Sequence, residues 1–141
     1  MKHIQWFPGH MTKAMRMMEE QVKLVDGVLF VLDARAPLAT RNPNLESLLG
    51  GKPVLYLLNK ADLADEEKTA ACCARMDRAG EANVRCCATT SAAARQISGR
   101  IPSLLREKLA RDAAKGITRP PRLMVVGIPN TGKSTVINAL S

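Results

Sequence analysis

The chain has 141 residues, with 21 Lys or Arg and 13 Asp or Glu, so its net charge is +8 at neutral pH. This length supports one domain, because a typical domain has about 100–200 residues. Aromatic residues make up only 3% of the sequence, which argues against RNA or single-strand binders that stack bases on several rings.

The positive charge favours polyanionic partners such as nucleic acid or the ribosome, and a well-solvated basic surface is the alternative. A loose basic cluster extends from Arg106 to Arg122. No apolar run approaches the roughly 18 residues that span a membrane. Because Pro8, Gly9 and His10 interrupt the amino-terminal segment, it does not resemble a signal peptide. We therefore expect a cytoplasmic protein without a membrane partner.

Hydrophobic periodicity predicts a helix followed by buried strands in the first half of the chain. Apolar residues at helical spacing predict an amphipathic helix over His10–Val25. Continuous apolar runs predict strands over Val28–Leu32 and Val54–Leu58, as found in parallel sheets with both faces covered. A short helix over Pro43–Leu49 is predicted between them, and Asp33–Pro37 is predicted to be a loop.

The second half continues the alternation. Asp65 is the predicted N-cap of a helix that ends near Ala79. A short strand over Val84–Ala88 and a helix over Pro102–Ala114 follow. A fourth strand at Leu123–Val126 leads into a glycine-rich loop and a helix over 135–140. This order predicts an α/β fold with a parallel sheet flanked by helices.

The four cysteines form two adjacent pairs, Cys72–Cys73 and Cys86–Cys87. Neither pair has the C-x-x-C spacing of a zinc or redox motif. We expect reduced structural thiols, with no structural metal and no disulfide.

The most specific motif is the segment from Gly127 to Ser134, GIPNTGKS, which matches the phosphate-loop pattern G-x-x-x-x-G-K-[ST] in full. In such a loop, glycines let backbone N–H groups surround phosphate oxygens, and the following helix N-terminus adds partial positive charge. The lysine contacts the β- and γ-phosphates, and the serine hydroxyl binds Mg²⁺. The motif does not choose between ATP and GTP. The predicted contacts are Pro129, Asn130, Thr131, Gly132, Lys133, Ser134 and Thr135.

The choice of base rests on Asn59-Lys60-Ala61-Asp62, which follows the second predicted strand. The Asp62 carboxylate can accept hydrogen bonds from guanine N1–H and the 2-amino group, neither of which adenine has. Asn59 is predicted to bond N7, and the stem of Lys60 to lie over the base. An ordinary strand-end turn would give the same four letters, but the pairing with a phosphate loop on the same sheet favours a guanine site.

These two motifs occur together in Ras-like GTPases, where the phosphate loop comes first; here the order is reversed. Over its whole length the chain resembles the circularly permuted ribosome-biogenesis GTPases of the YlqF/RbgA type. The resemblance rests on five segments: Gln5–Met11 (QWFPGHM), Asp33–Pro37 (DARAP), Arg41–Pro43 (RNP), Asn59–Asp62 (NKAD) and Gly127–Ser134.

The resemblance implies GTP and GDP binding, Mg²⁺ dependence and GTP hydrolysis coupled to assembly of the large ribosomal subunit. It implies a precursor of that subunit, or its rRNA, as partner. It also implies that His10 positions the attacking water, although a packing role at a helix start is the alternative. A base-contacting loop should follow the third strand at Thr89 and Thr90, where a Ser/Thr helix cap is the alternative. The oligomeric state is left open.

We divide the chain into an amino-terminal segment and helix (1–26), a base-recognition half (27–117), and a phosphate-loop part (118–141). Four of the usual six strands are present, and the family analogy predicts the spatial order 4-1-2-3. The switch threonine and D-x-x-G loop of the family would follow the phosphate loop. We therefore expect an incomplete permuted P-loop GTPase domain, without efficient hydrolysis by these 141 residues alone. The alternatives are a non-catalytic basic RNA- or ribosome-binding fragment and an unrelated P-loop ATPase.

Overall fold

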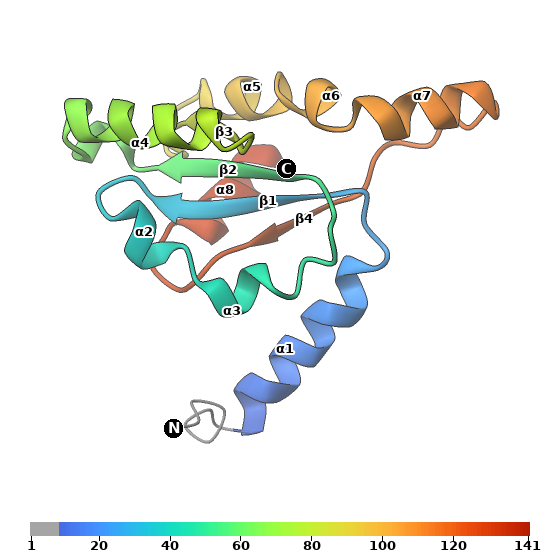
Figure 1. Cartoon of the computed structure of the whole chain (residues 1–141), viewed down its shortest axis with the longest axis horizontal. Coiled ribbons are helices and arrows are strands. Elements are labelled where there is room, and N and C mark those ends of the chain that lie inside the picture. Colours follow the sequence, from blue (N-terminus) through green and yellow to red (C-terminus); the bar gives the residue numbers. More distant parts are fainter. Residues whose placement is uncertain (1–8) are drawn as a thin grey trace.

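The computed structural model describes residues 9–141, with side chains from Met15 onward. Its centre is a four-stranded sheet formed by β1 (Gly27–Asp33), β2 (Val54–Asn59), β3 (Ala82–Arg85) and β4 (Leu123–Val126). The order is β3-β2-β1-β4 and all pairings are parallel (Figure 1). The predicted α/β class and the spatial order 4-1-2-3 are therefore confirmed.

The two central strands are buried along almost their whole length, which explains their continuous apolar sequences. Helices cover both faces, so residues on either side of each strand must be apolar. The register pairs Val28 with Val54 at the start of the strands and Asp33 with Asn59 at their ends. The two polar residues thus lie side by side at the carboxyl edge of the sheet.

One face of the sheet is covered by α1 (Gly9–Val22), α3 (Pro43–Glu46) and α4 (Glu66–Arg78). Val22, Leu49 and Met76 pack there against Phe30 and Tyr56. The amino-terminal part of α1 extends away from the body of the protein (Figure 1).

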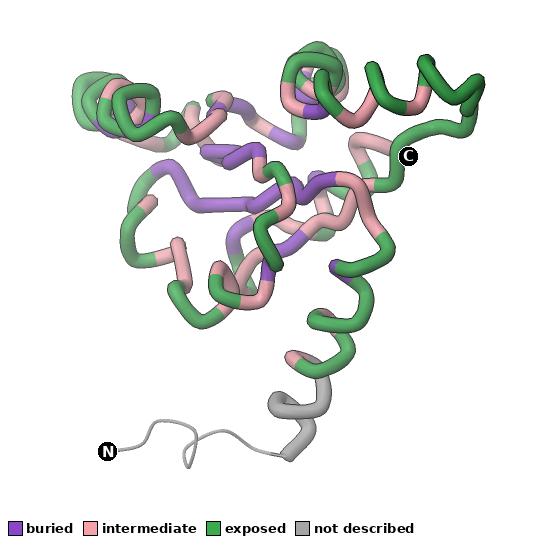
Figure 2. Tube along the Cα trace, turned by 45° about the vertical axis from the view of Figure 1, so that its right-hand side comes forward, coloured by how far each residue is buried: buried purple, intermediate pink, exposed green. Residues whose placement is uncertain are grey.

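The opposite face is covered by α5 (Ala93–Ser98), α6 (Ile101–Leu104) and α8 (Lys133–Leu140). Ile97 and Val136 pack there against Leu29, Val31 and Leu57. Helix α7 (Arg106–Ala114) follows α6 and is exposed along most of its length (Figure 2).

Several predicted boundaries differ from the structure. Helix α1 ends at Val22 rather than Val25, and α3 ends at Glu46 rather than Leu49. Strand β3 begins two residues earlier than predicted and ends at Arg85. The helix predicted over 102–114 is divided at Leu105, which is fully buried and has non-helical dihedral angles.

A short helix, α2 (Pro37–Thr40), occupies part of the predicted loop after β1. Pro37 supplies the fixed φ angle that suits a first helical turn. The Thr40 hydroxyl donates to Ala36 O at 2.8 Å and accepts from Asp33 N at 3.0 Å, which ties the turn to the end of β1. Asp65 caps α4 as predicted, since its side chain accepts from Lys68 N.

Arg41 connects the loop after α2 to the sheet. Its guanidinium contacts the carboxylates of Glu46 and Glu81, donates to Tyr56 OH at 3.1 Å and lies 4.3 Å from the Tyr56 ring centroid. Burial raises the pKa of Tyr56 to about 12. The Arg41–Pro43 segment of the sequence is thus an anchor that fixes α3 against β2.

All four cysteines are free thiols in the structure, and Cys72 and Cys86 are buried. Among the described residues, no group of three or more His, Cys, Asp or Glu side chains could hold a metal ion. Within the same part of the chain, no helix has both the length and the apolar character needed to cross a membrane.

Candidate nucleotide site

The predicted nucleotide-binding segments meet at the carboxyl edge of the parallel sheet. Asn59 ends β2, the phosphate loop follows β4, and the loop at 86–92 follows β3. Parallel α/β sheets bind ligands at this edge because the loops after the strands converge there. Strand β1 lies between β2 and β4, so contacts between their loops must cross the end of β1.

The phosphate loop has the backbone geometry that its sequence predicts. Asn130 and Gly132 have positive φ angles of 70° and 93°. A Cβ atom at Gly132 would overlap the Asn59 side-chain amide, and one at Gly127 would lie 3.0 Å from Val31 O. The loop therefore requires glycine at both positions, because backbone and side chains approach closely.

The loop leads directly into α8, whose first residue is Lys133. Ser134 is exposed in the first turn of this helix, and Thr131 is buried with its hydroxyl donating to Ile128 O at 2.9 Å. The free N–H groups of the first turn of α8 point toward the loop, as in phosphate-binding helix N-termini. The helix starts two residues earlier than predicted, which places Lys133 and Ser134 within it.

Asn59 joins the two halves of the site. Its side chain is buried, donates from Nδ2 to Thr131 O at 3.0 Å, and accepts at Oδ1 from Ala88 N at 2.9 Å. One amide thus connects the phosphate loop to the loop after β3. The hydrogen bond to guanine N7 predicted for Asn59 would use the remaining Nδ2 hydrogen, because the other is bound to Thr131.

Lys60 makes a second connection to the phosphate loop. Its backbone is left-handed, with a φ of 61°, and Nζ donates to Asn130 O at 2.8 Å. Its stem consequently extends from the end of β2 toward the loop after β4. This position is compatible with the predicted contact between the stem and the face of a base.

Asp33 contributes to the site in a way that the motifs did not indicate. Its buried carboxylate accepts from Arg35 Nε at 3.0 Å and Nη2 at 2.7 Å, and lies 3.6 Å from Lys60 Nζ. The hydrogen bonds from Arg35 lower the pKa of Asp33 to about 2. Asp33 therefore stays ionised and helps to hold Lys60. The sequence signal that could have revealed this role is that Asp33 and Asn59 end two neighbouring parallel strands.

Asp62 lies in a short 3₁₀ helix, Ala61–Leu63, and its side chain is exposed. Within the described residues its carboxylate accepts no hydrogen bond, so both oxygens are available to a ligand. The hydrogen bond with Asp33 raises the pKa of the Arg35 guanidinium, and the negative charge of Asp62 raises it further by a smaller amount.

Thr89 and Thr90 are exposed in the turn after β3. Both the N–H and the hydroxyl of Thr90 donate to Cys87 O, at 2.9 and 2.8 Å. The Thr89 N–H has no acceptor among the described residues, which makes it the better candidate donor to a base. His10 lies in the first turn of α1, and its side chain falls outside the described part of the chain.

Comparisons with known proteins bear directly on this arrangement. The chain is 43% identical over 139 residues to Ribosome biogenesis GTPase A of Bacillus cereus, covering 98% of the chain and 47% of that protein. It is 40% identical to the mouse Mitochondrial ribosome-associated GTPase 1, covering 96% and 41%. The structure of GNP-bound YlqF from T. maritima matches with a TM-score of 0.62 at 32% identity, covering 91% of the chain and 47% of YlqF.

The chain is a homologue of the YlqF/RbgA GTPases. No family model matches it. The YlqF/RbgA resemblance inferred from the motifs is thus confirmed, and the four-stranded sheet is part of the circularly permuted P-loop GTPase fold. The chain spans about half the length of the curated relatives that it matches. A GDP-bound YlqF structure matches with the same TM-score of 0.62.

Proposed function

We propose that the chain binds GTP and GDP between the Asn59–Asp62 loop and the phosphate loop. The observation that carries the proposal is the Asn59 side chain, which ties the phosphate loop to the loop after β3 across the end of β1. Asn59 and Thr131, which are 72 residues apart in sequence, are thereby held in one site. Relatives named as GTPases, and YlqF structures titled as GDP- and GNP-bound, support the same ligand.

Each predicted contact receives a role in this proposal. Asp62 accepts from guanine N1–H and the 2-amino group, and the Lys60 stem covers the base. Thr89 and Thr90 lie beside the base, with the Thr89 N–H as the donor. Lys133 and the backbone amides of the loop hold the phosphates. The phosphate-loop contacts remain Pro129, Asn130, Thr131, Gly132, Lys133, Ser134 and Thr135.

The site fits a Mg²⁺ ion that is held mainly by the nucleotide. The Ser134 hydroxyl is exposed at the start of α8 and forms no hydrogen bond among the described residues. Mg²⁺ commonly binds few protein oxygens, together with substrate phosphates and water. The ion, when bound, would neutralise charge on the phosphates, and this chain would contribute the Ser134 oxygen.

We further propose that the whole protein hydrolyses GTP during assembly of the large ribosomal subunit. The names of the bacterial and mitochondrial relatives, together with the basic charge of the chain, support a ribosomal precursor or its rRNA as partner. His10 would orient or deprotonate the attacking water, since histidine can act near neutral pH. We propose the cytoplasm as the compartment, by analogy with the bacterial relatives.

An exchange of nucleotide preference tests the guanine assignment. Asp62→Asn should weaken GDP binding at least 100-fold, because the amide presents a donor where the base also donates. It should strengthen binding of xanthosine diphosphate, whose 2-oxo group can accept from the amide. Glu67→Gln is the matched control, because it also neutralises an exposed carboxylate, on α4.

Isothermal titration of each variant with both nucleotides gives the result. The proposal predicts that only Asp62→Asn exchanges its preference. Unchanged preference for GDP over xanthosine diphosphate in this variant would refute the assignment of Asp62.

A further inference from the structure

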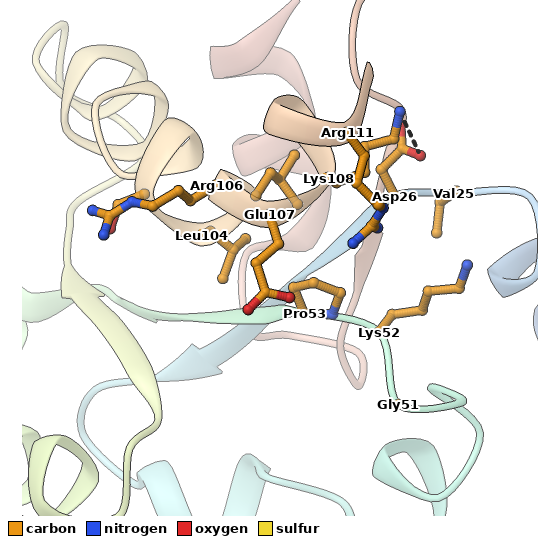
Figure 3. A pocket seen from close by; sticks show the side chains of 12 residues that line it. Val25, Asp26, Gly51, Lys52, Pro53, Leu104, Arg106, Glu107, Lys108 and Arg111 are labelled. Carbon is orange, nitrogen blue, oxygen red and sulfur yellow. Dashed lines mark ion pairs between the residues drawn. The ribbon is translucent and has the colours of Figure 1, made fainter. Parts of the chain in front are cut away.

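A second charged site lies at the opposite, amino edge of the sheet. A pocket of about 660 Å³ opens between the starts of β1 and β2 and helices α6 and α7 (Figure 3). Its lining includes Asp26, which precedes β1, and Pro53, which precedes β2. Strands of six or seven residues separate it from the nucleotide site, a distance of about 20 Å. A ligand here would not compete directly with a nucleotide.

Four of the lining residues are cationic: Lys52, Arg106, Lys108 and Arg111. The pocket borders the most basic segment of the chain. Residues 100–122 contain seven Lys or Arg and two Asp or Glu, a net charge of +5 out of +8 for the whole chain. More than half of the net positive charge of the chain, which favours a polyanionic partner, is therefore in the segment that borders this edge of the sheet.

Asp26 organises this edge. Its carboxylate, which is only 9% exposed, lies 3.6 Å from Lys108 Nζ and 3.7 Å from Arg119, and accepts from Arg122 N at 2.7 Å. Helix α7 and the segment before β4 are both held by this one carboxylate. Lys108 is also paired with Asp112, so its charge is largely neutralised within the protein.

The other three cations of the lining remain available. Within residues 15–141, Lys52, Arg106 and Arg111 form no ion pair. Figure 3 shows the Arg106 side chain extending away from the Asp26–Lys108 pair, so the free cations are spread along the pocket rather than gathered at one point. Glu107 contributes one carboxylate to the lining. A spread of cations suits an extended series of phosphates better than a single small anion.

We propose that this pocket and the exposed face of α7 bind the phosphate backbone of double-stranded RNA. No aromatic residue lines the pocket, so bases cannot stack there, and recognition must rest on charge and shape. The inference rests on the proposed ribosomal role only in naming RNA as the polyanion. The surface is independent of the nucleotide site in its residues and in its position.

The test measures binding of a labelled 20-base-pair RNA duplex to the purified protein at several salt concentrations. The triple variant Lys52→Gln, Arg106→Gln, Arg111→Gln should bind about 10- to 100-fold more weakly near 0.1 M salt. The plot of log K against log salt should become less steep: the magnitude of its negative slope should decrease by about 2–3, since each lost phosphate contact removes about 0.7–0.9. Glu107→Gln should instead strengthen binding, because it removes the one lining carboxylate that, unlike Asp26, forms no ion pair in the described residues.

The matched control is Lys68→Gln, Arg75→Gln, Arg78→Gln on the exposed surface of α4. This control also removes three positive charges. None of its three residues forms an ion pair in the described part of the chain. Equal losses in both triple variants would show a general charge effect and overturn the proposal, as would no loss in either. Stronger competition by polyglutamate than by unlabelled duplex would assign the surface to an acidic protein and likewise overturn it.

Nucleotide affinity of the same variants separates this inference from the proposed GTP site. The Lys52, Arg106 and Arg111 variant should bind GDP as the unmodified protein does, because the altered residues lie at the other edge of the sheet. Loss of RNA binding with unchanged GDP binding would support the second site alone. Retained RNA binding with unchanged GDP binding would refute the second site and leave the nucleotide proposal intact.

Discussion

Replacement of Asn59 tests whether one buried amide holds the two loops of the nucleotide site together. Asn59→Ala removes the donor to Thr131 O and the acceptor from Ala88 N, and both of these residues are buried. Each orphaned backbone group costs about 1–3 kcal/mol. The free energy of unfolding without nucleotide should therefore fall by about 2–6 kcal/mol.

The affinity for GDP should fall as well, by at least tenfold, because binding must then order two loops that are no longer joined. Asn83→Ala is the matched control. Asn83 is also a buried strand asparagine with two hydrogen bonds, to Asp77 Oδ1 and Glu81 O, but it lies away from the phosphate loop. It should lose about 1–2 kcal/mol of stability, since water can reach the exposed Asp77, with GDP affinity unchanged.

Urea denaturation and GDP titration of the two variants complete the experiment. Retention by Asn59→Ala of both its stability, within about 0.5 kcal/mol, and its GDP affinity would refute this role of the amide. Equal loss of GDP affinity in both asparagine variants would also refute it, because the effect would then come from general destabilisation.

Three further predictions follow from individual contacts. Gly132→Ala should destabilise the protein by about 1–3 kcal/mol, from its positive φ and its overlap with Asn59, and the loss should be smaller in the Asn59→Ala background, as measured by a double-mutant cycle in urea. The absorbance of Tyr56, the single tyrosine, should titrate near pH 12 in the folded protein and near 10 in guanidinium; a folded-state midpoint of 10 would contradict its burial. Asp33 has a pKa of about 2 against an ordinary 3.8, so the stability it contributes is present above pH 4 and is lost as the pH falls through 2. Discounted for the half-exposed Arg35, this contribution is about 1 kcal/mol, and it should be absent from Asp33→Asn in acid-denaturation curves; identical curves would refute it.

The strands were the most predictable part of the fold. Val28–Leu32 and Val54–Leu58 are continuous apolar runs because both faces of a central parallel strand are buried. The sequence also predicted the strand order, through the resemblance to permuted GTPases. Helix ends were less predictable, because they depend on tertiary contacts. Burial of Leu105, for example, interrupts a stretch with otherwise regular helical spacing.

The motifs located the candidate site, but not how its parts are joined. The sequence indicated Asn59 and Lys60 as contacts to a base, whereas both also bind backbone carbonyls of the phosphate loop. That use depends on the distance between β2 and β4 in three dimensions, which local sequence does not contain. Asp33 was missed for the same reason: its role comes from lying beside Asn59 in the sheet.

For the proposed RNA-binding edge of the sheet, the sequence predicted only an excess of positive charge and not its location. The excess of Lys and Arg between residues 100 and 122 is visible in the sequence. Its concentration beside a pocket depends on Asp26, which draws together α7 and the segment before β4. Composition can therefore indicate a polyanionic partner, but the fold determines where that partner would lie.

The most direct test of the central claim is competition between nucleotides for the site that Asn59 and Lys60 connect to the phosphate loop. A fluorescent GDP analogue bound to the protein with Mg²⁺ would be displaced by unlabelled GDP or ADP. GDP should compete at least 100-fold more effectively, because only guanine presents the N1–H and 2-amino donors to Asp62. Equal competition by ADP, or no binding of the analogue at all, would contradict the account.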